Sequence, residues 1–160
     1  MSIIINTIES ILGIRTNYSF PERIAKGKEL LGRANSSIKI LSGTLNSEFY
    51  GNEEILKALR ESKAKVEIIH GPNVEENIIS GLENLSPNGR IKLYKLDTEP
   101  LGHFMVIDEK HVRVESDHLA TEKEKKAFIK YNSLFLAQRL DEEFMALKAN
   151  HEAGSSIKLK

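Results

Sequence analysis

The alternation of strand and helix between residues 38 and 96 constrains the fold more than any other feature of the sequence. Three short apolar runs have the character of strands, and two segments between them place apolar residues at helical spacing. The predicted strands cover residues 38–41, 64–70 and 90–96, and the predicted helices cover 53–62 and 74–85. Strands joined through helices require crossover connections, so the pattern predicts an α/β fold with a mostly parallel sheet and flanking helices.

Segments on both sides of this alternation extend it into one domain. Pro21 and Glu22 suit the first turn of a helix, which we expect over residues 21–34. Downstream, two short apolar strands are separated only by Glu109 and Lys110, which is the length of a tight hairpin. The predicted elements after residue 100 are strands at 103–108, 111–114 and 127–131 and a final helix at 134–149.

The two ends of the chain differ from this central part. Residues 3–14 place apolar side chains on one helical face, whereas the last residues are small or charged and lack an apolar pattern. A chain of 160 residues is long enough for one well-buried core. We therefore expect an N-terminal amphipathic segment and linker over 1–19, one domain over 20–149 and a flexible tail over 150–160.

The composition excludes several classes of protein. Basic and acidic residues number 23 each, so no overall field draws the chain to nucleic acid or to an anionic membrane, although a local basic patch is compatible with this balance. The absence of cysteine excludes disulfides and thiolate metal sites. No apolar run approaches the roughly 20 residues of a membrane span, and the first residues do not have the pattern of a signal peptide. We expect a soluble, cytoplasmic protein.

The predicted hairpin carries the most specific motif of the chain. It contains Phe104-Met-Val-Ile-Asp108-Glu-Lys110, and Ser116 follows its second strand. This segment resembles the part of the phospholipase D family's H-x-K-x-x-x-x-D motif that follows the histidine and lysine, and Ser116 stands where the family has the serine of its G-S-x-N segment. The resemblance covers about residues 21–149. It implies a phospholipase-D-like βαβ sandwich with a C-terminal hairpin.

The residues that carry the family's chemistry are replaced. The family uses a histidine that attacks phosphorus, a lysine that neutralises the phosphoryl oxygens and an aspartate that orients the imidazole. With Asp108 at the aspartate position, His103 stands at the lysine position and Leu101 at the nucleophile position. Leucine has no nucleophilic atom, and a mostly neutral imidazole replaces a permanent positive charge. Downstream, Glu115 replaces a glycine and His118 an asparagine, and the carboxylate is expected to repel a phosphate.

A second alignment keeps His103 as the nucleophile and also fails. In that alignment Met105 falls at the lysine position and Lys110 at the aspartate position. Pairing two copies of the chain would not restore the motif, because each copy contributes the same residues. Both alignments imply a degenerate motif, so no catalytic residue is expected.

Four residues at the ends of the hairpin strands are candidates for a remodelled site, and they are also the catalytic candidates if the chain is active: His103, Asp108, Ser116 and His118. In a binding pocket, the two histidines would donate to an anion and Ser116 would assist. In the alternative interpretation Asp108 supports the turn, Ser116 ends a strand and the histidines are surface residues.

His70 is a further candidate for ligand binding. It ends a predicted strand just before Gly71, at the carboxyl edge where open α/β sheets place their ligands, although a histidine at a strand end is often structural. The histidines lack the tight spacing of a closed metal site, so we expect neither a metal nor a cofactor. The aromatic pair Phe49 and Tyr50 suits either stacking on a base or sugar or an ordinary core position.

The sequence therefore favours a catalytically inactive phospholipase-D-like binding module for a phosphate-containing ligand or nucleic acid, acting as a homodimer or with a protein partner. Two alternatives remain at this stage. One is a phosphodiesterase or nuclease with a rewired histidine site, in which His103 or His118 is the nucleophile. The other is a ligand-sensing regulatory domain that binds a small sugar or nucleotide.

Overall fold

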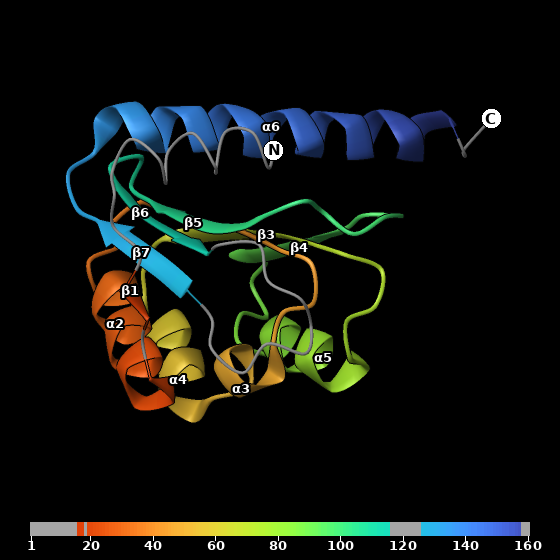
Figure 1. The fold of residues 1–160 in the computed structure, drawn as a ribbon. Helices are drawn as coiled ribbons and strands as arrows, with labels where there is room; N and C mark the ends of the chain where they lie inside the picture. Colours follow the sequence, from red (N-terminus) through yellow and green to blue (C-terminus); the bar gives the residue numbers. More distant parts are fainter. Residues whose placement is uncertain (1–15, 18, 116–125, 158–160) are drawn as a thin grey trace.

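The computed structural model describes residues 16–17, 19–115 and 126–157, and these residues form one mixed sheet between two helical layers. The strands are β1 (Thr16–Asn17), β2 (Ser37–Ser42), β3 (Lys65–His70), β4 (Ile91–Lys95), β5 (His103–Ile107), β6 (His111–Glu115) and β7 (Lys126–Lys130). The helices are α2 (Phe20–Gly32), α3 (Ser47–Tyr50), α4 (Glu53–Glu61), α5 (Glu76–Asn84) and α6 (Leu134–Ile157). Among the described residues, helix α6 covers one face of the sheet, and α2 to α5 lie on the other (Figure 1).

The sheet confirms the predicted α/β class and the hairpin, but it is not mostly parallel. Its strand order is β1-β7-β6-β5-β2-β3-β4. Only the pairs β2–β3 and β3–β4, which come from the strand-helix-strand units, are parallel. The hairpin strand β5 inserts beside β2 in the antiparallel direction, and β6, β7 and β1 continue antiparallel from it. The prediction of a mostly parallel sheet was wrong because local periodicity does not show which distant strand a hairpin strand pairs with.

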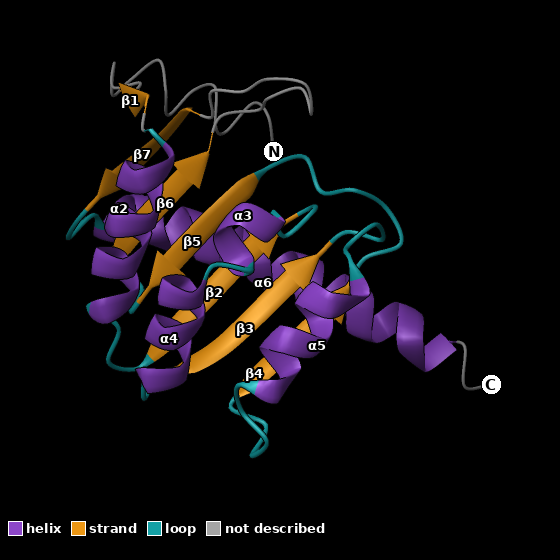
Figure 2. Cartoon of the chain, turned by 90° about the horizontal axis from the view of Figure 1, so that it is seen from below, coloured by secondary structure: helices purple, strands orange, loops and turns teal. Residues whose placement is uncertain are grey.

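Side chains alternate between two cores on the two faces of the sheet. In β2, Ile38 and Ile40 pack toward α2 to α5, while Leu41 packs toward α6. This alternation is the period of two expected of a strand that is buried on both sides. Figure 2 looks onto the face covered by α2 to α5.

The helices begin where the sequence provides caps. Ser19 and Glu22 form a capping box at α2, with Pro21 in its first turn. The side chain of Asn52 caps α4 by accepting from the N–H of Glu54 at 2.9 Å. Two short elements were not predicted, β1 with two residues and α3 with four, because neither is long enough to show a period.

Helix α6 is longer than predicted. It runs to Ile157, so residues 150–157 are helical where a tail was expected, and the predicted end at residue 149 was wrong. Ion pairs fix it to the sheet: Lys39 pairs with Asp141, and Lys148 with Glu67 at 2.5 Å. Because both pairs lie in the middle of α6, beside its apolar stripe, they reinforce the packing of the helix on the sheet. The predicted N-terminal amphipathic segment lies outside the described residues. Within the described ranges, no helix is long and apolar enough to cross a membrane.

Candidate functional site

The open end of the β5–β6 hairpin brings polar side chains to the carboxyl edge of the parallel strands. His103 begins β5 and pairs directly with Glu115, the last residue of β6. Residues opposite each other in an antiparallel pair project from the same face. Strand β5 also lies beside β2, and Leu41 pairs with Phe104, so His103 lies next to the turn that follows Ser42. The predicted convergence of chain segments at this edge is therefore present for His103.

The imidazole of His103 is fixed by the backbone. Its Nδ1 accepts a hydrogen bond from the N–H of Gly43 at 3.2 Å. Because Nδ1 accepts, the neutral ring carries its proton on Nε2, which makes Nε2–H a donor. The half-buried side chain thus has one orientation and one tautomer in the neutral state. This arrangement suits the donation to an anion that the sequence predicted.

A small hollow lies beside His103. It has a volume of about 20 Å³, which admits a single water-sized group. Its lining combines hydroxyl, amide, imidazole and guanidinium groups with aromatic rings, from Arg23, Leu41, Ser42, Thr44, Asn46, Phe49, Tyr50, His103, Phe104, Arg113 and Glu115. As the side chains lie, the hollow accepts one polar group of a ligand rather than a whole nucleotide.

Arg113 and Glu115 form an ion pair in the wall of the hollow. The distance from Arg113 Nη2 to Glu115 Oε1 is 2.6 Å, and both side chains are largely buried. The guanidinium of Arg113 also lies over the ring of Phe49, 5.1 Å from its centroid. Glu115 therefore does not stand in the site as an unbalanced negative charge. The expected repulsion of phosphate by this carboxylate is offset by Arg113, which sequence reasoning did not connect with it.

Arg23 supplies the second guanidinium, and its donors are not all used. The side chain is 13% exposed, and its nearest carboxylate oxygen, Oε2 of Glu48, lies 4.0 Å from Nη2. Its Nε is buried and has no acceptor among the described residues. A buried donor without an acceptor is costly, so this N–H is a natural partner for a ligand oxygen. The sequence signal for Arg23 was weak because arginine is ordinary on an exposed helix.

Asp108 lies at the other end of the hairpin and does not join His103. Five residues of extended strand separate them by roughly 17 Å. The Asp108 carboxylate accepts hydrogen bonds from the backbone N–H groups of Asn35, Ser36 and Ser37 at 2.8–2.9 Å. Asp108 therefore lies apart from His103, because the hairpin places it at the turn. The alternative interpretation, that Asp108 supports the turn, agrees with this position.

The electrostatics of Asp108 match this structural role. Burial favours the neutral acid, but the backbone hydrogen bonds from Ser37, Ser36 and Asn35 outweigh it and lower the pKa of Asp108 to about 2. Asp108 and Glu109 adopt positive φ angles of 51° and 55°. Both values belong to the left-handed region that tight hairpin turns require, and aspartate tolerates it better than most residues.

His70 is buried and does not line the hollow. Its Nδ1 donates to the carbonyl oxygen of Gly71 at 2.8 Å, so the ring is engaged with its own strand end. Burial lowers the pKa of His70, although the hydrogen bond to Gly71 opposes this effect. Ligand binding by His70 therefore has no geometric support at this site.

The remaining candidates lie apart from the hollow or beyond the described residues. Leu101, at the family's nucleophile position, is 67% exposed in the loop before β5. Met105, the lysine position of the second alignment, is buried in the core. Phe49 and Tyr50 are core residues as well as wall residues, and burial raises the pKa of the Tyr50 hydroxyl. Ser116 and His118 lie in the segment 116–125, which is outside the described residues.

No group of three or more histidine or acidic side chains suited to a metal occurs in the part of the chain that the structure describes. The hollow instead offers hydrogen-bond donors from both charged and neutral groups. Donors arranged around a small space stabilise an oxyanion rather than a cation.

Comparison with known proteins identifies the fold. No family model and no curated protein matches the sequence. Among solved structures, Nuc from Salmonella typhimurium, described as a phospholipase D family member, is 16% identical with a TM-score of 0.59, over 78% of this chain and 85% of that one. NucT from Helicobacter pylori is 14% identical with a TM-score of 0.59, over 83% and 94%. The chain has a phospholipase-D-like fold.

A third solved structure is of a different kind. TrmBL2, an archaeal chromatin protein whose structure shows a novel mode of DNA binding, is 17% identical with a TM-score of 0.60. The match covers 86% of this chain and 52% of TrmBL2, so the chain spans about half the length of that protein. Phospholipase-D-like folds thus occur in proteins described in different functional terms.

Proposed function

We propose that this chain is a catalytically inactive phospholipase-D-like module that binds a phosphate-bearing ligand, with nucleic acid as the favoured class. The observation that carries the proposal is that Arg23 lines the hollow and that its buried Nε lacks an acceptor among the described residues. The phosphate oxygen enters the hollow, and Arg23 and the His103 Nε2–H donate to it. The rest of the ligand lies outside, because the hollow has room for one small group.

The loss of catalysis follows from what replaces the family's nucleophile. Leu101 has no atom that can attack phosphorus, and its side chain extends into solvent. His103 is oriented by the N–H of Gly43, and Asp108, the aspartate of the predicted motif, lies at the far end of the strand. In this proposal His103 acts as a donor rather than as a nucleophile.

Nucleic acid is favoured over other phosphate compounds for two reasons. A ligand with repeating phosphates can place one in the hollow while its remainder follows the surface outside. One structure of similar fold, TrmBL2, is described as a DNA-binding chromatin protein. Because the chain has no net charge, attraction to DNA must come from local groups such as Arg23 and His103.

The module acts as a homodimer or with a protein partner in this proposal. Leu134 and Phe135 at the start of α6 are 68% and 77% exposed, which is unusual for two adjacent large apolar residues. Light scattering of the wild type and of Phe135→Ser tests this part. A dimer that the substitution dissociates is expected, whereas a monomeric wild type would remove the dimer from the proposal.

The binding experiment uses fluorescence anisotropy with a labelled oligothymidylate at low salt. We expect saturable binding that weakens steeply as salt is added. Arg139→Met is the matched control, because Arg139 is an exposed arginine on α6 that does not line the hollow. Binding that is absent at low salt, or that Arg139→Met weakens as much as Arg23→Met does, would overturn the proposed site.

A further inference from the structure

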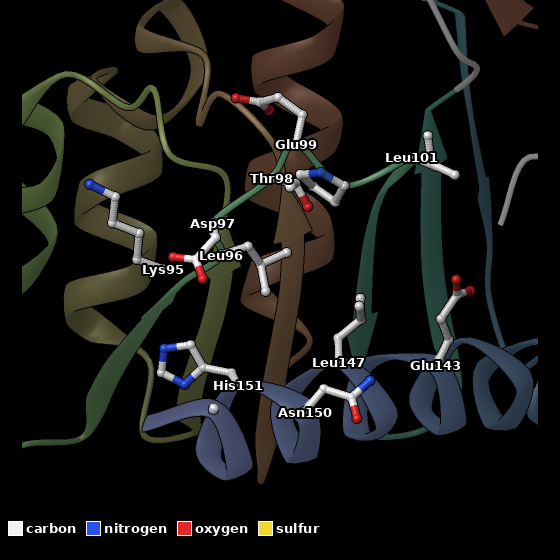
Figure 3. A pocket seen from close by; sticks show the side chains of 12 residues that line it. Lys95, Leu96, Asp97, Thr98, Glu99, Leu101, Glu143, Leu147, Asn150 and His151 are labelled. Atoms are coloured by element: carbon white, nitrogen blue, oxygen red, sulfur yellow. The ribbon is translucent and has the colours of Figure 1, made fainter. Parts of the chain in front are cut away.

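A second cavity lies on the face of the sheet that carries α6, away from the hollow (Figure 3). One wall is the loop between β4 and β5, from Leu96 to Leu101, and the other is the C-terminal half of α6. Its volume is about 550 Å³, which lies within the range of sites for small ligands. The proposed function makes no use of this cavity, which we name the α6 groove.

The loop that forms one wall is held in place. The Glu99 carboxylate lies against two strand ends, since a Cβ on Gly71 would come within 2.5 Å of Glu99 Oε2 and a Cβ on Gly43 would also collide with it. Asn73 Nδ2 donates to Glu99 Oε1 at 3.4 Å. Glycine at both positions therefore allows the loop to pack closely on the sheet edge. A ligand in the α6 groove finds a wall that is already formed, so binding requires little ordering.

The middle of the α6 groove is apolar. Leu96 points from the loop and Leu147 from α6 toward the space between them (Figure 3). Leu101, at the end of the loop, also lines the groove and is 67% exposed. A ligand with a methylene chain would remove this apolar surface from water.

The charged side chains of the groove are mostly acidic. Asp97 lies on one side of the two leucines and Glu143 on the other (Figure 3). Lys95 is the only lysine or arginine among the described lining residues, and its ammonium points away from α6. Asp97 and Glu143 thus flank the apolar middle, whereas the third lining carboxylate, that of Glu99, packs against Gly43 and Gly71.

Glu143 has an unused acceptor. Its Oε2 is buried and has no hydrogen-bond donor among the residues that the structure describes. Burial raises the pKa of Glu143, because the charged form is poorly solvated there, and the positive charge of the N-terminal amino group only partly opposes this effect. An ammonium group placed beside Oε2 would satisfy this oxygen and favour its charged form.

We propose that the α6 groove binds a linear aliphatic diamine, with one ammonium at Glu143, the second at Asp97 and the methylene chain over Leu96 and Leu147. Each part of the ligand matches one part of the cavity: the two ammonium groups pair with Asp97 and Glu143, and the methylene chain covers the apolar middle. A monoamine satisfies only one carboxylate, and an uncharged diol satisfies neither. The proposal does not rest on phosphate binding, because the α6 groove and the hollow share no lining residue.

The test is a titration of the ¹⁵N-labelled protein followed by amide chemical shifts. The probe is hexamethylenediamine, compared with hexylamine and with hexamethylene glycol. We expect saturable shifts confined to the loop from Leu96 to Leu101 and to the C-terminal half of α6. The diamine should bind about tenfold more tightly than hexylamine, since one charge-assisted contact distinguishes them. A glycol that binds as tightly as the diamine, or shifts outside the groove, would overturn the proposal.

Variants locate the two ammonium sites. Glu143→Gln and Asp97→Asn should each lower the affinity for hexamethylenediamine about tenfold, to that of hexylamine. Asp97 lies in a loop, so Asp97→Asn keeps the test informative even if Glu143→Gln perturbs the helix. Glu142→Gln, an exposed neighbour on α6, is the matched control and should leave the affinity unchanged. Equal affinities of all four proteins would contradict the proposed contacts.

Discussion

The two ends of the β5–β6 hairpin differ in what their polar residues contact. At the turn, Asp108 accepts hydrogen bonds from three backbone N–H groups at and before the start of β2. At the open end, His103 and the Arg113–Glu115 ion pair line a small hollow. The turn end therefore organises the backbone, whereas the open end presents side chains to a space that a ligand group can enter.

Removal of the Asp108 carboxylate is expected to have the largest effect on stability. Asp108→Ala leaves three N–H groups without their acceptor and places alanine at a positive φ, so we expect a loss of about 2–4 kcal/mol in the free energy of unfolding. Urea denaturation measures it. Asp108→Asn is the matched variant, because asparagine tolerates this φ and retains one acceptor oxygen, and it should lose about half as much. A change below about 0.5 kcal/mol in Asp108→Ala would contradict the structural role.

At the open end of the hairpin, substitutions should change the affinity for the oligothymidylate rather than the free energy of unfolding. Arg23→Met removes the buried guanidinium and should weaken binding of the oligothymidylate about tenfold or more, which is about 1.4 kcal/mol. The free energy of unfolding should be unchanged or slightly higher, since a buried donor without an acceptor is removed. A binding role for Arg23 would be contradicted if Arg23→Met lowered the free energy of unfolding as much as Asp108→Ala does and left the affinity of the folded protein for the oligothymidylate unchanged.

The pH dependence of the free energy of unfolding tests the structural role of Asp108. The folded-state pKa of Asp108, about 2, lies below its ordinary value of 3.8, so the folded state favours the charged carboxylate. This contribution is fully present above about pH 5 and is lost as pH falls toward 2. After allowance for solvent screening, we expect a loss of about 1 kcal/mol over this range. Urea titrations at several pH values should show this component in the wild type and not in Asp108→Asn. An identical pH dependence in both would exclude it.

The smallest expected effect concerns Glu115. Glu115→Gln removes the charge that neutralises Arg113 in the wall of the hollow. The affinity for the oligothymidylate should rise about threefold, or about 0.7 kcal/mol, because a second guanidinium then acts on the phosphate. The anisotropy titration measures this change. Weaker binding by a folded Glu115→Gln would show that Glu115 organises the site rather than limiting its charge.

The sequence predicted the parts of the fold that have a local signal. Pro21 and Glu22 in the first turn of α2, the helical stripes and the hairpin were visible in the order of residues, whereas Ser19, the N-cap of α2, was assigned to the linker. The antiparallel insertion of β5 beside β2 was not, because it joins strands more than sixty residues apart. The continuation of α6 was missed for a similar reason, since Lys148 contacts Glu67 on a distant strand.

Of the candidate site, the sequence identified His103 but not the guanidinium groups around it. Arg113 was visible as a charge within an apolar strand, on the same face as Glu115, which could have marked it as a buried pair. Arg23 carried no such mark, because a helix surface normally contains arginine and only the packing of α2 against the sheet edge buries it. Long-range packing, rather than any local pattern, assembles the hollow.

We propose that the open end of the hairpin binds phosphate without performing phosphoryl chemistry, and one experiment separates the two properties. The purified wild type and His103→Ala are incubated with an oligothymidylate, and binding by anisotropy and cleavage are measured in the same samples. We expect saturable binding by the wild type, weaker binding by His103→Ala and no cleavage above background in either. Cleavage by the wild type that His103→Ala abolishes would contradict it.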